Sequence, residues 1–182
     1  MTKYSSFLVI TLLLFLCSCG DAQTSSAKNI VKKELKSSFG IVKFDDNITG
    51  FKFTTMIGTK FVFSPKGEED LKNENPTSGF YIQPLKGMGK EEASSHLGDF
   101  SSQFSEQEIY KSSENYAVKM ITVNLHKATI VSFNVTEKNG SKTFCTHCIM
   151  SNGENAIMFI GTDYENGIYA EKFINTFKSI EL

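Results

Sequence analysis

The chain has 182 residues, with 19 basic and 20 acidic side chains and a formal net charge of -1. All of the basic residues counted there are lysines, because the sequence contains no arginine. A near-neutral protein without guanidinium groups lacks the bidentate phosphate contacts that nucleic-acid binding favours, so we expect no nucleic-acid partner.

The first 18 residues have the pattern of an export signal. Lys3 supplies a positive charge, and Phe7–Leu16 is an apolar run of about ten residues. As a helix of about ten residues it would be about 15 Å long, half of the roughly 30 Å hydrocarbon core of a bilayer. We therefore interpret residues 1–18 as a signal peptide and not as a membrane span.

The residues Leu16, Cys17, Ser18 and Cys19 resemble the lipobox of bacterial lipoproteins, in which a leucine stands three positions before the modified cysteine and a small residue stands directly before it. With Cys19 as the acceptor, Leu16 and Ser18 occupy these two positions. With Cys17 as the acceptor, the bulky Leu16 would stand directly before it. The resemblance implies a diacylglyceryl group on Cys19 and cleavage after Ser18. An ordinary secretory signal with incidental cysteines is the alternative.

A lipid on Cys19 would anchor the mature protein in the bacterial cell envelope, with the choice between inner and outer membrane left open. Residues 19–27 are then the lipidated cysteine and a small, polar tether. Residues 28–182 have the length of one domain and are long enough to bury a hydrophobic core.

The first half of this domain is predicted to begin with a helix. Apolar residues near helical spacing alternate with lysines over 27–39, which favours a short amphipathic helix. Phenylalanines then alternate with polar residues on both sides of Gly58, which predicts two strands over 51–63. A charged, turn-rich loop at 64–79 follows, and 80–85 is expected to return to the sheet.

The second half predicts a helix at 90–104, because apolar residues there recur every three or four positions. Four apolar runs joined by short polar turns follow, at 119–125, 128–135, 143–150 and 156–161, and predict an antiparallel meander. The chain should end in a helix at 166–178, with Ile168, Phe173, Ile174 and Phe177 on one face. The predicted fold class is α+β, an antiparallel sheet with a mid-chain helix and a C-terminal helix packed on it.

This order of elements, with its closing sequence FINTFKSIEL, resembles the PsbP-like and DcrB-like α-β-α sandwiches over most of residues 50–182. The resemblance implies an accessory or binding module and not an enzyme.

Cys145 and Cys148 are the candidate reactive residues, because paired cysteines with His147 between them are similar to the motif of thiol-disulfide oxidoreductases. In those enzymes the first cysteine lies at a helix N-terminus, whereas here the pair falls in a predicted strand. A regular strand would separate the two α-carbons by about 10 Å, beyond the roughly 4.4 to 6.8 Å that a disulfide needs. The pair therefore forms a structural disulfide only if the strand is interrupted, and otherwise remains two inert thiols.

Zinc binding by these cysteines with His96, His126 or His147 is a further alternative. A structural zinc site takes four ligands, often as two close pairs, and the chain offers one such pair. We therefore expect no metal and no cofactor.

Together these features predict a membrane-anchored, non-catalytic lipoprotein of the bacterial envelope that binds another envelope protein. Two alternatives remain: an immunity lipoprotein directed against an envelope-acting toxin, and a thiol-disulfide oxidoreductase that uses Cys145 and Cys148.

Overall fold

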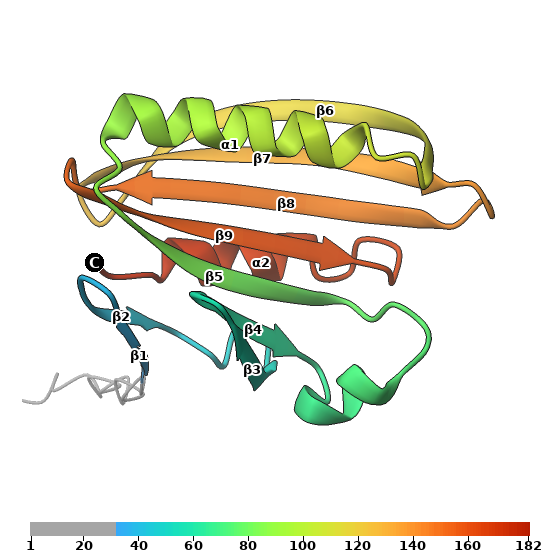
Figure 1. Cartoon of the computed structure of the whole chain (residues 1–182), viewed down its shortest axis with the longest axis horizontal. Helices are drawn as coiled ribbons and strands as arrows, with labels where there is room; N and C mark the ends of the chain where they lie inside the picture. Colours follow the sequence, from blue (N-terminus) through green and yellow to red (C-terminus); the bar gives the residue numbers. More distant parts are fainter. Residues whose placement is uncertain (1–31) are drawn as a thin grey trace, which may run out of the picture. The chain divides into compact units, whose positions relative to one another are not determined.

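The computed structural model describes residues 32–182, which belong to one compact unit. These residues form a seven-stranded antiparallel sheet between two helices, with a separate two-stranded hairpin beside the second helix (Figure 1). The predicted α+β class, with the mid-chain helix and the C-terminal helix on the sheet, is confirmed. The predicted signal peptide at 1–18, the lipid site Cys19 and the tether at 19–27 lie outside the described residues.

The elements have the following bounds: β1 Lys33–Ser37, β2 Gly40–Phe44, β3 Lys52–Ile57, β4 Lys60–Ser64, a 3-10 helix η1 Gly67–Lys72, β5 Gly79–Lys86, α1 Lys90–Ser105, β6 Tyr110–Val123, β7 His126–Glu137, β8 Lys142–Ser151, β9 Asn155–Asp163 and α2 Ala170–Lys178.

The strand order of the large sheet is β3-β4-β5-β9-β8-β7-β6. Strands β6 to β9 are sequential antiparallel neighbours, so the predicted meander is confirmed. β5 extends the sheet by pairing with β9, which places β3 at one edge and β6 at the other. The two edges differ in length, because β3 is a short strand and β6 has 14 residues.

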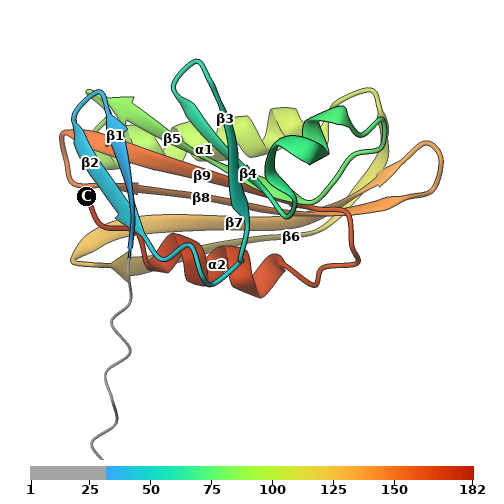
Figure 2. The same ribbon diagram turned by 90° about the horizontal axis from the view of Figure 1, so that it is seen from below.

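One face of the sheet packs on α2 and on the β1–β2 hairpin (Figure 2). We call it the α2 face. Its core is dominated by phenylalanines, and the ring of Phe80 stacks on Phe63 and on Phe159 with centroids 4.8 Å apart in each pair. Phe173 of α2 is fully buried against this cluster. Gly161 makes the close approach feasible, because a Cβ atom there would lie 2.5 Å from the Phe173 ring.

The opposite face packs on α1, and we call it the α1 face. Ala93 and Leu97 of the helix are buried, and Phe100 and Phe104 pack on the same cluster while remaining partly exposed. This stripe is the one that the spacing predicted. Glu91 and Glu92 lie in the first turn, where carboxylates favour the helix N-terminus.

The predicted helix over 27–39 is wrong where the structure describes the chain. Lys33–Ser37 and Gly40–Phe44 instead form an antiparallel hairpin with Leu35 paired to Val42. Both of these side chains are buried, and Phe44 of β2 is buried as well, so these three positions hold the hairpin on the core. Lys33 and Lys36, which suggested the polar face of a helix, are partly exposed and exposed positions of β1.

Two smaller expectations also differ from the structure. β6 begins at Tyr110, about nine residues before the apolar run that predicted it, because its first half is an exposed strand without apolar alternation. Ile168 precedes α2 and is exposed, whereas Phe173 and Phe177 are buried as expected. Ile180, just after the helix, is fully buried on the same core.

Candidate functional site

The two candidate cysteines lie in β8, which pairs with both β7 and β9 without a register shift. Because successive side chains of a strand alternate between faces, residues three apart point to opposite sides. Cys145 accordingly belongs to the core of the α1 face and Cys148 to the core of the α2 face. Both thiols are free, and the sheet itself separates them.

The surroundings of the two thiols disfavour the thiolate form. Burial raises the pKa of Cys145 to about 12. Burial also raises the pKa of Cys148 well above its usual value, although the nearby charge of Lys178 acts in the opposite direction. A thiolate is the nucleophile in disulfide exchange, so this environment argues against the oxidoreductase alternative.

His147 points from β8 into the α1 face and is fully buried. Its Nδ1 lies 2.9 Å from Ser101 Oγ of α1, and the rings of Phe100, Phe104 and Phe133 surround it at centroid distances of 5.3, 5.1 and 4.9 Å. Burial lowers the pKa of His147 to about 3, so the imidazole is neutral near pH 7. Its Nε2 has no partner within the described residues.

The Ser101–His147 pair resembles part of a hydrolytic site only in composition. Both side chains are fully buried, and His147 lines neither of the two clefts described below. A substrate could not reach the serine without displacing α1. The pair is therefore best understood as a polar contact that holds α1 on the sheet.

The three histidines named as zinc alternatives occupy separate positions. His96 lies on α1, His126 begins β7, and His147 is in the middle of β8. Residues 32–182 contain no group of three or more histidine, cysteine or acidic side chains arranged to hold a metal ion. Over the same residues, no helix is both long and apolar enough to cross a membrane.

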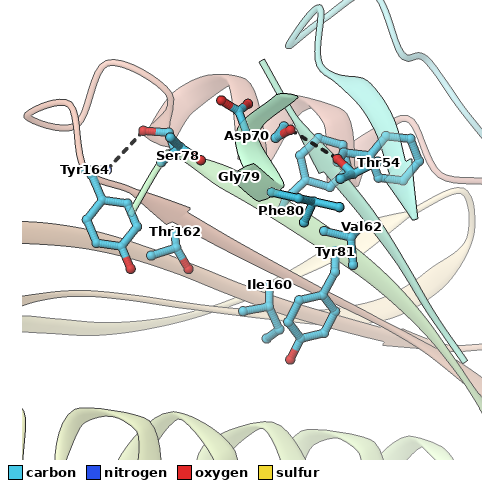
Figure 3. Close-up of a pocket in the computed structure, with 14 residues that line it drawn as sticks. Thr54, Val62, Asp70, Ser78, Gly79, Phe80, Tyr81, Ile160, Thr162 and Tyr164 are labelled. Atoms are coloured by element: carbon cyan, nitrogen blue, oxygen red, sulfur yellow. Dashed lines mark hydrogen bonds between the residues drawn. The ribbon is translucent and has the colours of Figure 1, made fainter. Parts of the chain in front are cut away.

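A small cleft of about 250 Å³ lies where η1 passes over β4, β5 and β9. Figure 3 shows Tyr81 and Tyr164 pointing from the sheet toward the side of α1. Burial raises the pKa of Tyr81 to about 12, and Lys60 Nζ lies 4.6 Å from the centre of its ring. Ser78 Oγ accepts the Tyr164 N–H and donates to Asp163, so the polar groups at this end serve the fold.

Asp163 illustrates that structural role. It is fully buried, and its carboxylate accepts backbone N–H groups from Glu165 and Tyr169 in addition to the Ser78 hydroxyl. A carboxylate with several such donors organises the loop between β9 and α2. We find no nucleophile and base facing one another in this cleft.

A larger cleft of about 550 Å³ lies between the first turns of α1 and the strands β6, β7 and β8. Its floor combines Ala93 and Ile149 with a polar contact, because Ser94 Oγ lies 3.1 Å from Thr129 Oγ1. Lys90, Glu91 and Lys127 stand among the residues that line it. We call this the α1–β6 cleft.

The cleft is continuous with an apolar strip on β6. Tyr116, Val118 and Met120 are 48%, 61% and 81% exposed. These three residues lie on the α1 face, because their neighbours on β7 are Phe133, Val131 and Thr129, respectively. The ring of Tyr116 stacks on that of Phe133, with centroids 5.6 Å apart. α1 covers the neighbouring strands β7 and β8 and leaves this strip open.

Sequence reasoning missed this site. It is assembled from residues 90–94, 120–129 and 149–151, whose proximity depends on the strand order. Val118 and Met120 are the residues that could have indicated it. Large apolar side chains exposed on an edge strand mark an interaction surface.

No family model matches the chain, and no curated protein sequence matches it. Solved structures do resemble it. The solution structure of cyanobacterial PsbP (CyanoP) from Synechocystis has a TM-score of 0.54 and 11% identity, over 92% of this chain and 98% of that chain. A mutant of protein Mog1 has a TM-score of 0.51 and 10% identity, over 83% and 95% of the two chains.

A crystal structure from Bacteroides thetaiotaomicron has a TM-score of 0.52 and 14% identity and covers 82% of this chain. The chain spans about half of that protein, or 47% of its length. At these identities the similarities show the fold alone. They confirm the PsbP-like part of the predicted resemblance at the level of the fold.

Proposed function

We propose that this protein is a non-catalytic, lipid-anchored binding module of the bacterial envelope, and that it binds another protein at the α1–β6 cleft. The observation that carries the proposal is the exposed strip of Tyr116, Val118 and Met120 beside an open cleft of about 550 Å³. Large apolar side chains gathered on one surface are typical of interaction sites.

The composition of the surface favours a protein partner. Tyrosine and methionine are enriched at protein interfaces, and methionine adapts its shape to a partner. The exposed strip extends beyond the cleft along β6, which suits a partner larger than a small metabolite. The polar rim of the cleft, which includes Lys90, Glu91 and Lys127, matches the usual pattern of an apolar centre inside a polar margin.

The charges at the rim suggest what the partner presents. Neither Lys90 nor Lys127 forms an ion pair within the described part of the chain. A carboxylate of the partner placed over the cleft could meet both ammonium groups. Complementary charge of this kind contributes to specificity and to the rate of association.

Photocrosslinking in intact cells tests the binding proposal. A photoreactive residue in place of Thr122, which lines the cleft, should give a specific adduct whose partner mass spectrometry identifies. The same residue in place of Lys52, exposed on the opposite edge of the sheet, should not. Binding of the identified protein in purified form should fall at least tenfold with Lys90→Glu and Lys127→Glu together. Unchanged affinity would reject the cleft as the site.

The same experiment addresses the immunity alternative, because a toxin imported from another cell would be captured only when that toxin is supplied. Anchoring is tested separately by labelling with a fatty acid. Cys19→Ala should abolish the label, whereas Cys17→Ala should leave it unchanged. Label that persisted in the Cys19 variant would contradict the chosen register.

A further inference from the structure

The turn after β6 determines which backbone groups of that strand face away from the sheet. Asn124 and Leu125 form a two-residue turn with φ values of 46° and 70°, and Val123 pairs with His126. Positive φ at both positions is the mark of a type I′ hairpin, whose closing pair exchanges backbone hydrogen bonds. The bonding pattern of the whole adjoining segment follows from this pair.

Because hydrogen-bonded and non-bonded pairs alternate along an antiparallel ladder, every second residue of β6 turns its N–H and C=O outward. These residues are Val118, Met120 and Thr122. β6 is the last strand in the sheet order of the described residues, so no neighbouring strand there receives these groups. The same residues place their side chains on the α1 face, and Met120 is the most exposed large apolar side chain within the strand.

Only part of this edge is regular. The register shifts between Tyr110 and Ser112 and again between Glu114 and Ala117, and Asn115 there has a φ of 58°. Bulges of this kind prevent another strand from pairing. The regular part is 117–123, and Met120 lies at its centre.

We propose that a second copy of this chain pairs with this edge, so that residues 117–123 of the two copies run antiparallel about a two-fold axis at Met120. In this register Met120 faces Met120 of the second copy, and Val118 faces Thr122 of the second copy. The outward groups of each strand then meet their counterparts and form about six hydrogen bonds. This inference goes beyond the proposed function.

The charge pattern favours this pairing. Lys119 is the one charged side chain of 117–123 and faces Ile121 of the second copy in the proposed register. A shift of the register by two residues toward the start of β6 would place the two-fold axis at Lys119 and the two Lys119 side chains opposite one another, which is unfavourable. The register of greatest overlap therefore also avoids the like-charge contact, and it joins the two Val118–Met120 strips into one.

The pairing would bring the two clefts together. Directly opposite residues of an antiparallel pair point to the same face, so both α1 helices would lie on one face of a continuous sheet. Met120 lines the α1–β6 cleft in each copy. The two clefts would adjoin at the axis, and a partner bound there would contact both chains.

Disulfide trapping of the full chain in native membranes tests the arrangement. Met120→Cys should form a disulfide-linked dimer on mild oxidation, because opposite bonded residues have α-carbons about 5.5 Å apart, within the disulfide range. Leu125→Cys is the matched control, since Leu125 is 95% exposed at the hairpin tip. Its two copies would lie roughly 33 Å apart along the paired strands and should not crosslink. The wild-type chain reports any background from the native cysteines.

The register is tested by a mixed pair. Val118→Cys alone should give no dimer, whereas co-expression with Thr122→Cys should give a dimer between the two variants. As a second measurement, Met120→Lys should halve the mass of the chain found by sedimentation in detergent, and Leu125→Lys should not change it. A wild-type monomer, or crosslinking at residue 125 equal to that at residue 120, would overturn the proposal. Neither of these outcomes affects the Lys90 and Lys127 test of the cleft.

Discussion

The two faces of the sheet are covered to different extents. On the α2 face, α2 and the β1–β2 hairpin pack on a cluster in which Phe44, Phe63, Phe159 and Phe173 are all almost fully buried. On the α1 face a single helix covers the central strands, and the α1–β6 cleft and the apolar strip of β6 remain beside it. The buried centre of the α1 face also includes a polar pair, Ser101 and His147.

We therefore expect the α2 face to contribute mainly to stability and the α1 face to contribute to binding. Apolar burial contributes about 25 cal/mol per Å² to folding, so the α2 face, which has the larger aromatic cluster, should carry more of the stability. The α1 face leaves apolar surface in contact with solvent, which costs stability unless a partner covers it. Mutations should therefore have their largest effects on stability in the α2 face.

Phe173→Ala should produce the largest effect. The ring is fully buried and lies within 6.1 Å of the ring centres of Phe51, Phe80 and Phe159. Its removal leaves a cavity and should lower the free energy of unfolding by about 3 to 5 kcal/mol. Urea denaturation provides the measurement, and Phe53→Ala, at a partly exposed aromatic, is the control. A loss below about 1 kcal/mol would contradict the packing of α2 on the sheet.

The two cysteines allow the stability of the two faces to be compared directly, because one cysteine lies on each face. Cys148→Ser places a hydroxyl in the apolar core of the α2 face and should cost about 1 to 3 kcal/mol. Cys145→Ser should cost less, because the core of the α1 face already includes polar groups, among them those of Ser101 and His147. Denaturation of the two single variants measures the order, and a larger loss for Cys145→Ser would contradict it.

The raised pKa values make a second, chemical prediction for these residues. Alkylation of the folded protein at pH 8 should leave Cys145 and Cys148 unmodified, whereas both should react in denaturant. The purified protein should show no reductase activity on a disulfide substrate. Rapid modification of either thiol in the folded state, with turnover, would support the oxidoreductase alternative instead.

Much of this fold was predictable because the buried strands and helices have clear periods. Ala93 and Leu97 marked α1, and Phe173 and Phe177 marked α2. The hairpin at 33–44 was not predictable from period alone, since a short segment with Leu35 as its one buried residue fits a helix or a strand equally well. Pairing with β2 and packing on the core decide the outcome.

The candidate site was less predictable than the fold. Cys145 and Cys148 are three positions apart. If the segment is a strand, this spacing already places their side chains on opposite faces. The α1–β6 cleft has no such local signal, because it depends on α1 covering β7 and β8 but not β6. The sequence also gave no indication that His147 would be buried beside Ser101, 46 positions away.

His147, which is buried on the α1 face, predicts that the free energy of unfolding depends on pH. Its pKa is about 3 in the folded protein and about 6.5 in the unfolded chain, so the unfolded state binds the proton first as the pH falls. Its contribution to stability is fully present above pH 6.5 and is lost progressively between pH 6.5 and 3. A fall from pH 6.5 to 5.5 should remove roughly 1 kcal/mol. His147→Gln should lack this difference when unfolding is measured across the same range. An equal slope in both proteins would show that other groups cause it.

The smallest effect on stability is expected at the centre of the strip. Met120→Ser removes a side chain that is 81% exposed and keeps the backbone of the edge, so the free energy of unfolding of the monomer should change by about 0.5 kcal/mol or less. The same change removes the apolar contact proposed at the two-fold axis and should weaken self-association. A protein at low concentration should therefore unfold like the wild type, while at high concentration the wild type alone gains stability from pairing. Denaturation at two protein concentrations separates these effects. A large loss at low concentration would mean that Met120 belongs to the core and that the two faces differ less than their packing indicates.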